Sequence, residues 1–224
     1  MTTDTEVENN LARLKKLDCC ALSDALDKLG LKGVVSGFPQ QSGEGRIAGR
    51  AITVKLGTGE PPPGPPTHLC STAINLGGPH SVIVVEQRTG IEAGSWGGLL
   101  TLGAKLRGIA GVIADGPVRD VDEARQYGFP VFTHSLTALT ARGRIVEKAT
   151  NVSVTIGSVT VNPGDYVAAD RSGVIFIAES SIDAVLNAAE LIVAREAAIA
   201  KALLSGASIS VAMGADYSNC LYAL

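Results

Sequence analysis

The sequence predicts an α/β fold, as a single domain with a mixed sheet and a long C-terminal helix. Two short apolar runs, at 81–86 and 111–115, are typical of buried parallel strands, and a segment with helical spacing follows each of them. Residues 150–178 instead show the short alternating runs of antiparallel strands. A βαβ order followed by a β-rich segment predicts a layered fold with a mixed sheet, not a uniform doubly wound one.

The amino-terminal part of the chain is predicted to hold two short helices before the first strand. Residues 1–10 are polar and acidic, and we expect them to be frayed. Apolar residues then recur at helical spacing in 11–17 and again in 22–29, where Gly30 follows as a helix end. A turn-rich link over 33–45 leads to a strand at 47–56.

A proline-rich segment follows this strand. Residues 57–66, GTGEPPPGPP, hold five of the ten prolines, so the segment cannot be a helix or a central strand. We expect a stiff loop of polyproline type, which either borders the functional site or is a plain surface excursion. A short helix over 67–76 and the strand at 81–86 come next.

Residues 94–120 contain two glycine-marked junctions between a strand and a helix. The first is Gly94–Gly98; the helix that follows has Leu99, Leu102 and Leu106 on one face and ends at Gly108. The second junction, Gly116–Pro117, comes after the strand 111–115 and leads to a helix over 121–127 that Gly128 ends. A strand is expected to begin at Val131.

The amino ends of these two helices form the candidate site. Free N–H groups and a partial positive charge at neighbouring helix starts, beside the carboxyl ends of strands, make a site for a small anion. Arg119 adds a fixed cation and Asp120 a hard oxygen ligand, which points to a carboxylate substrate with a divalent metal. Glu86 and Asp115, at the strand ends, are candidate supporting acids; ordinary surface placement is the alternative for Glu86. Arg119 and Asp120 could also be only a helix cap and a surface pair.

Short strands and one long helix are predicted for the rest of the chain. The strands are expected at 152–156, 159–161 and 166–169, as an antiparallel meander, and then at 173–178. Ser180 or Ser181 is expected to cap a helix over 182–204. The tail, 207–224, is apolar enough to pack on a neighbouring molecule or on its own core.

Composition excludes several classes of partner. A net charge of −3 and an aromatic content of 4% argue against nucleic acid, and the apolar helix 182–204 carries too many charges to cross a membrane. The four cysteines show no CxxC spacing, so we expect free thiols in a reducing compartment, which predicts a cytoplasmic protein. The three histidines form no paired zinc motif.

Four segments together resemble one family. They are SDALDKLG (23–30), WGGLL (96–100), DGPVRDVDEARQYGFPVF (115–132) and PGDYVAADRSGVIFI (163–177). The chain is similar, from about residue 20 to 195, to the 4-hydroxy-4-methyl-2-oxoglutarate aldolases and regulators of ribonuclease activity A, the RraA-like proteins, formerly misnamed as demethylmenaquinone methyltransferases.

The resemblance implies a swivelling β/β/α-type domain, assembled as a homotrimer or a dimer of trimers with sites near subunit boundaries. It implies a pyruvoyl-type 2-oxo acid as substrate, with Arg119 contacting the substrate and Asp120 binding Mg²⁺ or Mn²⁺. The substrate carboxylate would meet the backbone amides of four residues, namely Gly97, Gly98, Leu99 and Leu100.

The favoured function is therefore a metal-dependent lyase that cleaves a carbon–carbon bond through a metal-stabilised enolate. The family aldolases carry an aspartate at the position of Gly98. Retro-aldol cleavage needs a base for a hydroxyl proton, whereas oxaloacetate decarboxylation needs only the electron sink, so Gly98 favours decarboxylation. The alternative is a non-catalytic trimer that binds an RNA-degrading enzyme.

Overall fold

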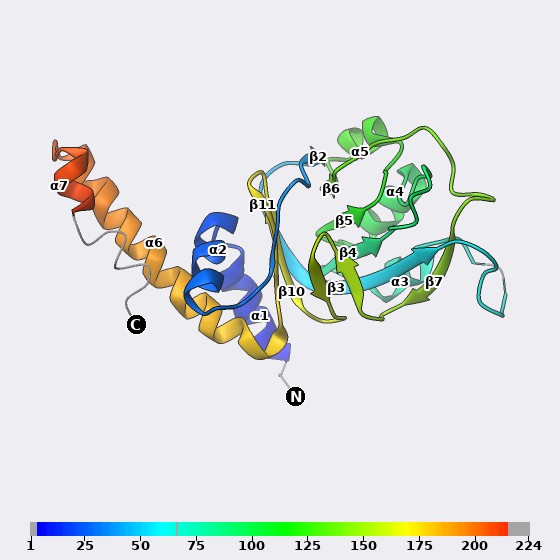
Figure 1. The fold of residues 1–224 in the computed structure, drawn as a ribbon, viewed down its shortest axis with the longest axis horizontal. Helices are drawn as coiled ribbons and strands as arrows, with labels where there is room; N and C mark the ends of the chain where they lie inside the picture. Colours follow the sequence, from blue (N-terminus) through cyan, green and yellow to red (C-terminus); the bar gives the residue numbers. More distant parts are fainter. Residues whose placement is uncertain (1–3, 66, 215–224) are drawn as a thin grey trace.

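A computed structural model describes residues 4–65 and 67–214. The described residues form a nine-stranded mixed sheet in the order β1-β11-β10-β3-β4-β5-β6-β2, with β7 paired to β3, and a separate hairpin of β8 and β9. One group of helices, α3 to α5, lies beside the parallel strands, and a second group, α1, α2 and α6, lies at the other end of the sheet (Figure 1). The predicted mixed α/β fold with a long C-terminal helix is confirmed.

Parallel strands form the half of the sheet that positions the candidate site. They are β3 (Ile47–Gly57), β4 (Ser81–Glu86), β5 (Gly111–Asp115) and β6 (Val131–Thr133). The helices between them are α3 (Ser71–Leu76), α4 (Gly98–Leu106) and α5 (Val121–Tyr127). These helices bury apolar residues such as Ile74, Leu100 and Ala124 against one face of the sheet. The predicted helix ends are confirmed, since Gly108 and Gly128 have φ of 72° and 62°, the left-handed conformation that favours glycine.

Of the four leucines of α4, the three that the pattern placed on one face, Leu99, Leu102 and Leu106, lie on the side turned away from the sheet. Leu99 and Leu106 are 86% and 79% exposed. Leu100 and Ala104 are the residues that pack on the sheet. The amphipathic pattern therefore predicted the helix correctly, but two of the three apolar side chains on this face are exposed and only Leu102 is half-buried.

The other strands extend the sheet antiparallel or cover its second face. β10 (Tyr166–Asp170) pairs with β3 and with β11 (Gly173–Ile177), which β1 (Val34–Val35) continues, and β2 (Gln40–Ser42) pairs with β6. The hairpin of β8 (Val154–Ile156) and β9 (Val159–Val161) packs on the second face against residues such as Val84 and Ile113. The predicted antiparallel pairing of the strands at 152–156 and 159–161 is confirmed, but the third strand of the predicted meander is wrong, because β10 pairs with β3 instead of continuing from β9. The strand β7 (Val146–Thr150) was not predicted, since its residues are all half-buried and show no alternation.

The remaining helices pack around β10 and β11. They are α1 (Asp4–Leu14), α2 (Cys19–Lys28) and α6 (Ile182–Leu204), which share a core with Tyr166 and Ile175. The prediction that residues 1–10 are frayed is wrong from Asp4 onward. Leu11 and Leu14 are fully buried, and the Arg13 guanidinium donates to both carboxylate oxygens of Glu190 on α6 at 2.8 Å, which fixes the first helix.

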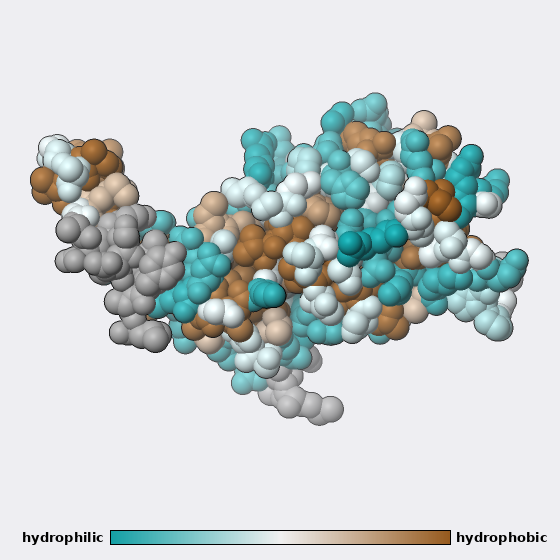
Figure 2. All heavy atoms as spheres, in the orientation of Figure 1, coloured by the Kyte–Doolittle hydropathy of each residue, from teal (hydrophilic) through white to brown (hydrophobic). Residues whose placement is uncertain are grey.

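The C-terminal helix runs out beyond the body of the molecule (Figure 1). A 3-10 turn (Glu179–Ser181) leads into α6, and α7 (Ile209–Met213) folds against its far end. Apolar side chains gather over α7 (Figure 2), where Ile209 and Val211 are exposed. The described part of the tail therefore packs on α6 and not on the main core, while residues 215–224 lie outside the described residues. None of the described helices is long and apolar enough to cross a membrane.

Candidate functional site

The loops that follow β4, β5 and β6 run side by side beyond the carboxyl edge of the sheet. The Ser95 amide donates to the Pro117 carbonyl at 2.7 Å, and the Arg119 amide donates to the Trp96 carbonyl at 3.0 Å. The Thr137 amide donates to the Val118 carbonyl at 3.0 Å. These bonds extend the parallel pairing past the strands, so the two predicted junctions meet, and the starts of α4 and α5 are neighbours.

Trp96 anchors the first junction. Its side chain is fully buried, stacks on Phe129 with ring centroids 6.5 Å apart, and donates from Nε1 to Thr101 Oγ1 at 2.8 Å. Since Thr101 lies in the first turn of α4, this hydrogen bond fixes the helix start relative to the core. Loops held in this way by a rigid scaffold commonly carry binding residues.

The amino end of α4 presents open backbone donors. The Gly98 amide donates to Asp120 Oδ2 at 3.0 Å, so one of the four predicted amides already has an acceptor. No described residue accepts a hydrogen bond from the amides of Gly97, Leu99 or Leu100. Three of the four predicted amides are therefore available to an anion at the positive end of the helix.

Asp120 adopts a strained backbone conformation. Its φ of 59° and ψ of 36° are left-handed, and its side chain makes no capping bond to its own helix α5. The carboxylate instead reaches Gly98 at the start of α4, and Arg119 Nε lies 3.3 Å from Oδ1. A non-glycine residue in this region costs about 1–3 kcal/mol and is found mainly at functional sites. Asp120 thus caps the start of α4 and pairs with Arg119, as the alternative prediction has it, but it does not cap its own helix α5.

Arg119 lies across two glycines. A Cβ on Gly94 would stand 2.9 Å from Arg119 Cδ, and a Cβ on Gly97 would stand 3.2 Å from Arg119 Cγ. The first junction therefore needs glycine at these positions to let the arginine stem approach. Arg119 and Asp120 line an open cavity of about 670 Å³, together with Glu123 and the loop at Leu136–Ala138.

The oxygen ligand available at this site suits a hard cation that retains most of its water ligands. Asp120 offers one half-buried carboxylate, and no group of three histidine, cysteine, aspartate or glutamate side chains that could hold a metal occurs among the described residues. Mg²⁺ commonly binds through one or two carboxylates plus waters and substrate oxygens, whereas a structural zinc site needs about four protein ligands. The residues present therefore fit Mg²⁺ or Mn²⁺ bound together with a substrate.

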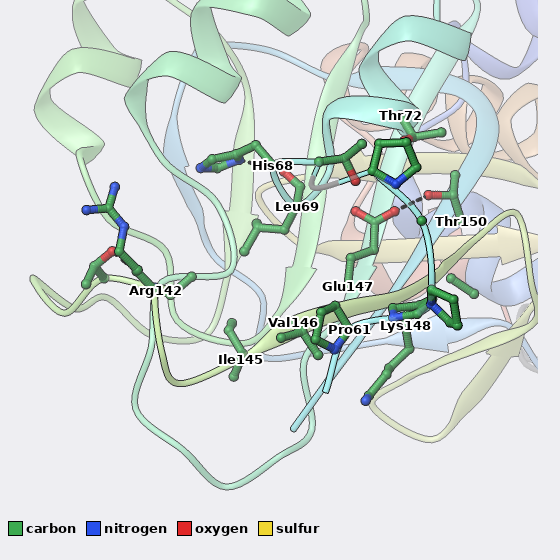
Figure 3. A pocket seen from close by; sticks show the side chains of 18 residues that line it. Pro61, His68, Leu69, Thr72, Arg142, Ile145, Val146, Glu147, Lys148 and Thr150 are labelled. Atoms are coloured by element: carbon green, nitrogen blue, oxygen red, sulfur yellow. Dashed lines mark hydrogen bonds between the residues drawn. The ribbon is translucent and has the colours of Figure 1, made fainter. Parts of the chain in front are cut away.

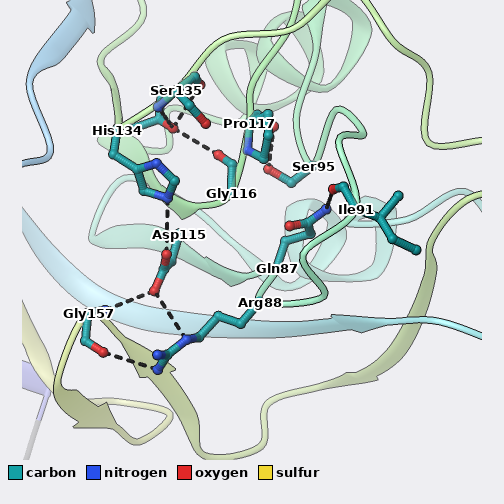
Figure 4. A network of polar contacts seen from close by, with 11 residues as sticks. Gln87, Arg88, Ile91, Ser95, Asp115, Gly116, Pro117, His134, Ser135 and Gly157 are labelled. Atoms are coloured by element: carbon teal, nitrogen blue, oxygen red, sulfur yellow. Dashed lines mark hydrogen bonds and ion pairs between the residues drawn. The ribbon is translucent and has the colours of Figure 1, made fainter.

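Glu86 and Asp115 do not support this site. Both side chains point to the opposite face of the sheet, where they hold the β8–β9 hairpin. Glu86 accepts from the Thr155 amide at 2.5 Å. Figure 4 shows Asp115, which accepts from the Gly157 amide at 2.8 Å. Asp115 also lies 3.2 Å from His134 Nε2. Because alternate residues of a strand face opposite ways, the carboxylates share the hairpin side with Val84 and Ile113.

The proline-rich loop lines a different cavity, of about 630 Å³ (Figure 3). The residues lining it include Pro61–Pro63 and the segment 140–142, and none of them lines the cavity at Arg119. Glu147 lies at this cavity and accepts from the Cys70 amide at 2.6 Å. The proline-rich loop therefore does not border the cavity at Arg119, and the structure favours the prediction of a surface excursion.

The described cysteines are free thiols, as predicted. Burial raises the pKa of the Cys70 thiol well above its usual range, and burial together with the charge of Asp170 raises the pKa of Cys19. A thiol held in its neutral form is a poor nucleophile. Neither buried cysteine is therefore a candidate for chemistry.

Comparison with known proteins gives consistent matches. Residues 19–176 match the model of the RraA-like family, Aldolase/RraA. A protein of Halalkalibacterium halodurans named putative 4-hydroxy-4-methyl-2-oxoglutarate aldolase is 26% identical over 180 residues, covering 80% of this chain and 81% of that protein. Protein DlpA of Legionella pneumophila is 31% identical over 204 residues, which are 91% of this chain but 33% of DlpA. This chain thus spans about a third of that relative.

A solved structure shares the fold over nearly the whole length. The crystal structure of an uncharacterized protein from Pseudomonas syringae pv. tomato has a TM-score of 0.81 and 29% sequence identity. The similarity covers 92% of each chain.

Proposed function

Since the chain belongs to the RraA-like family, Aldolase/RraA, we propose that it is a divalent-metal-dependent carbon–carbon lyase acting on pyruvoyl-type 2-oxo acids. The reactions would be aldol cleavage of 4-hydroxy-4-methyl-2-oxoglutarate, decarboxylation of oxaloacetate, or both. The observation that carries the proposal is that the open amides at the start of α4 lie beside Asp120, which accepts from the Gly98 amide and lines one cavity together with Arg119.

The α4 amides and Arg119 would bind different groups of the substrate. The amides of Gly97, Leu99 and Leu100 would hold the substrate carboxylate at the positive end of α4. Arg119, fixed by Gly94 and Gly97 beneath its stem, would offer its guanidinium to the oxygen on which negative charge develops during cleavage.

Asp120 would hold Mg²⁺ or Mn²⁺ through its carboxylate, which the Gly98 amide orients. When bound, the ion supplies a Lewis acid for the 2-oxo group and its carboxylate. The left-handed backbone of Asp120 turns its side chain away from α5 and toward α4, where the substrate carboxylate would lie. This conformation would therefore hold the proposed metal ligand beside the proposed anion site.

Turnover with a chelator control tests the proposal. Purified protein is assayed for pyruvate release from 4-hydroxy-4-methyl-2-oxoglutarate and from oxaloacetate, first with Mg²⁺ or Mn²⁺ and then with excess EDTA. We expect turnover of at least one substrate that EDTA abolishes and added metal restores. If neither substrate is turned over, the lyase proposal fails, and the non-catalytic regulator of an RNA-degrading enzyme becomes the better proposal.

We also propose a homotrimer or a dimer of trimers. Support comes from Leu99 and Leu106, two large apolar side chains exposed on α4, and from the exposed apolar side chains over α7. Contiguous exposed apolar surface marks contact sites in soluble proteins. Light scattering on dilute protein should give a multiple of three subunits, and a stable monomer would overturn the assembly.

A further inference from the structure

Glu123 places a second carboxylate at the amino end of α4. A Cβ built on Gly98 would lie 1.9 Å from Glu123 Oε2 and 2.8 Å from Glu123 Cδ. The same point is 3.3 Å from the Cβ of Asp120. The Glu123 carboxylate therefore occupies the space that any side chain at residue 98 would need, and glycine is what allows this approach.

The position of Glu123 brings it into the Arg119 cavity. Glu123 lies three residues after Asp120, so the two share a face of the first turn of α5, and both line the cavity. No described residue forms a hydrogen bond or an ion pair with the Glu123 carboxylate. Its neighbour Asp122, by contrast, pairs with Arg125 at 3.1 Å. Glu123 thus brings an uncommitted proton acceptor to the place where the substrate would bind.

We propose that Glu123 is the general base of retro-aldol cleavage in this chain, a role that rests on the proposed lyase function. Glu123 takes the proton of the C4 hydroxyl group, C4 becomes a carbonyl carbon, and the C3–C4 bond breaks. The electron pair of that bond remains on C3 as the enolate of pyruvate. C3 then takes a proton from water and Glu123 releases its proton to the solvent, so that 4-hydroxy-4-methyl-2-oxoglutarate gives two molecules of pyruvate.

Decarboxylation of oxaloacetate has no such requirement. The bond from C3 to the departing carboxylate carbon breaks, carbon dioxide leaves, and the substrate carries no hydroxyl proton that must be removed. A base positioned for the C4 hydroxyl therefore acts on one reaction and not on the other. The two substrates together separate a base from a residue that only stabilises the helix or the cavity.

The test compares Glu123→Gln with Asp122→Asn, a control that removes the same charge from the adjacent exposed residue. We expect Glu123→Gln to lower kcat for the hydroxy acid by about 10²-fold or more, the usual contribution of a general base, with KM nearly unchanged. Its oxaloacetate turnover should stay within a few-fold of the wild type. Asp122→Asn should leave both rates within a few-fold. Pyruvate binding, measured by calorimetry with Mg²⁺, should be the same in all three proteins.

A second pair of variants tests the position of the carboxylate without changing charge. Gly98→Ala puts a methyl group where the Glu123 carboxylate lies and 3.3 Å from the Cβ of Asp120, so it should lower hydroxy-acid cleavage more than oxaloacetate decarboxylation. Gly103→Ala is the matched control in the same helix, because its Cβ would meet only Ile74, at 3.7 and 3.9 Å, which are ordinary contacts.

Several outcomes would overturn the role of Glu123. Equal loss of both activities in Glu123→Gln would assign it a structural or binding role, and no loss would move the base elsewhere. Decarboxylation without any hydroxy-acid cleavage in the wild type would also overturn it, while leaving the lyase proposal standing. Absence of both activities in the wild type would instead overturn the proposed function itself.

Discussion

Asp120 combines a strained backbone, a capping contact and the proposed metal ligand, and three substitutions separate these roles. Asp120→Asn keeps an oxygen that can accept from Gly98 and a residue type that tolerates left-handed φ, but it removes the charge. Asp120→Ala loses both the acceptor and that tolerance. Asp120→Gly loses the acceptor but adopts the left-handed conformation without strain.

The expected stability changes follow from these contacts. Loss of the Gly98 bond resembles loss of a helix cap, about 1 kcal/mol, and alanine at left-handed φ adds up to about 1 kcal/mol. For a chain of this size, about 2 kcal/mol lowers Tm by roughly 4–8 °C. Asp120→Ala should therefore melt earliest, Asp120→Gly in between, and Asp120→Asn close to the wild type.

Activity should not follow the order of stability. All three variants should lose metal-dependent turnover, because none offers a carboxylate to the ion. Calorimetric melting measures the stability of each variant, and pyruvate release from the same preparations measures its activity. Wild-type turnover by Asp120→Asn in Mg²⁺ would refute the metal-ligand role. Equal Tm values for the alanine and asparagine variants would refute the stabilising role of the Gly98–Asp120 hydrogen bond.

Three further predictions concern other residues. Arg119→Ala should fold and lower turnover by about 10²-fold or more, as measured by steady-state kinetics, since it removes a preorganised cation; a smaller effect would place charge stabilisation elsewhere. In the native protein, iodoacetamide followed by peptide mapping should label exposed Cys20 but not Cys19 or Cys70, whose pKa values burial raises; rapid labelling of Cys70 would contradict its buried position. Burial alone would raise the pKa of Asp170, but hydrogen bonds from the Cys19 and Ser172 amides outweigh burial and lower it. The charged Asp170 side chain should therefore stabilise the fold at pH values above its unfolded pKa of about 3.9. In urea unfolding, the difference in unfolding free energy between the wild type and Asp170→Asn should shrink as the pH falls from about 6 to 3. A constant difference would contradict the lowered pKa of Asp170.

The sequence predicted the junctions of the site because glycine and proline mark them. Gly108 and Gly128 end the helices as expected, and the adjacency of β4, β5 and β6 follows from the βαβ order. The direction of the side chains was harder to predict. Glu86 and Asp115 end strands that are buried on both faces, so no polar and apolar alternation shows which face each carboxylate takes.

The role of Glu123 could not be read from local patterns. An acid in the first turn of a helix is ordinary, and only the tertiary approach of α5 to α4 brings its carboxylate onto Gly98. Sequence alone left open which group could replace the aspartate that the family aldolases carry at residue 98. The exposure of Leu99 and Leu106 was likewise hidden, because an apolar stripe looks the same whether a sheet or a partner covers it.

Binding of pyruvate, the product common to both proposed reactions, is the most direct test of the central claim that this cavity holds a 2-oxo acid together with a divalent ion. Isothermal titration calorimetry compares pyruvate binding to the wild-type protein in Mg²⁺ and in excess EDTA. The proposed site predicts saturable binding in Mg²⁺ that EDTA abolishes. Equal binding with and without the metal, or no binding in saturating Mg²⁺, would contradict it.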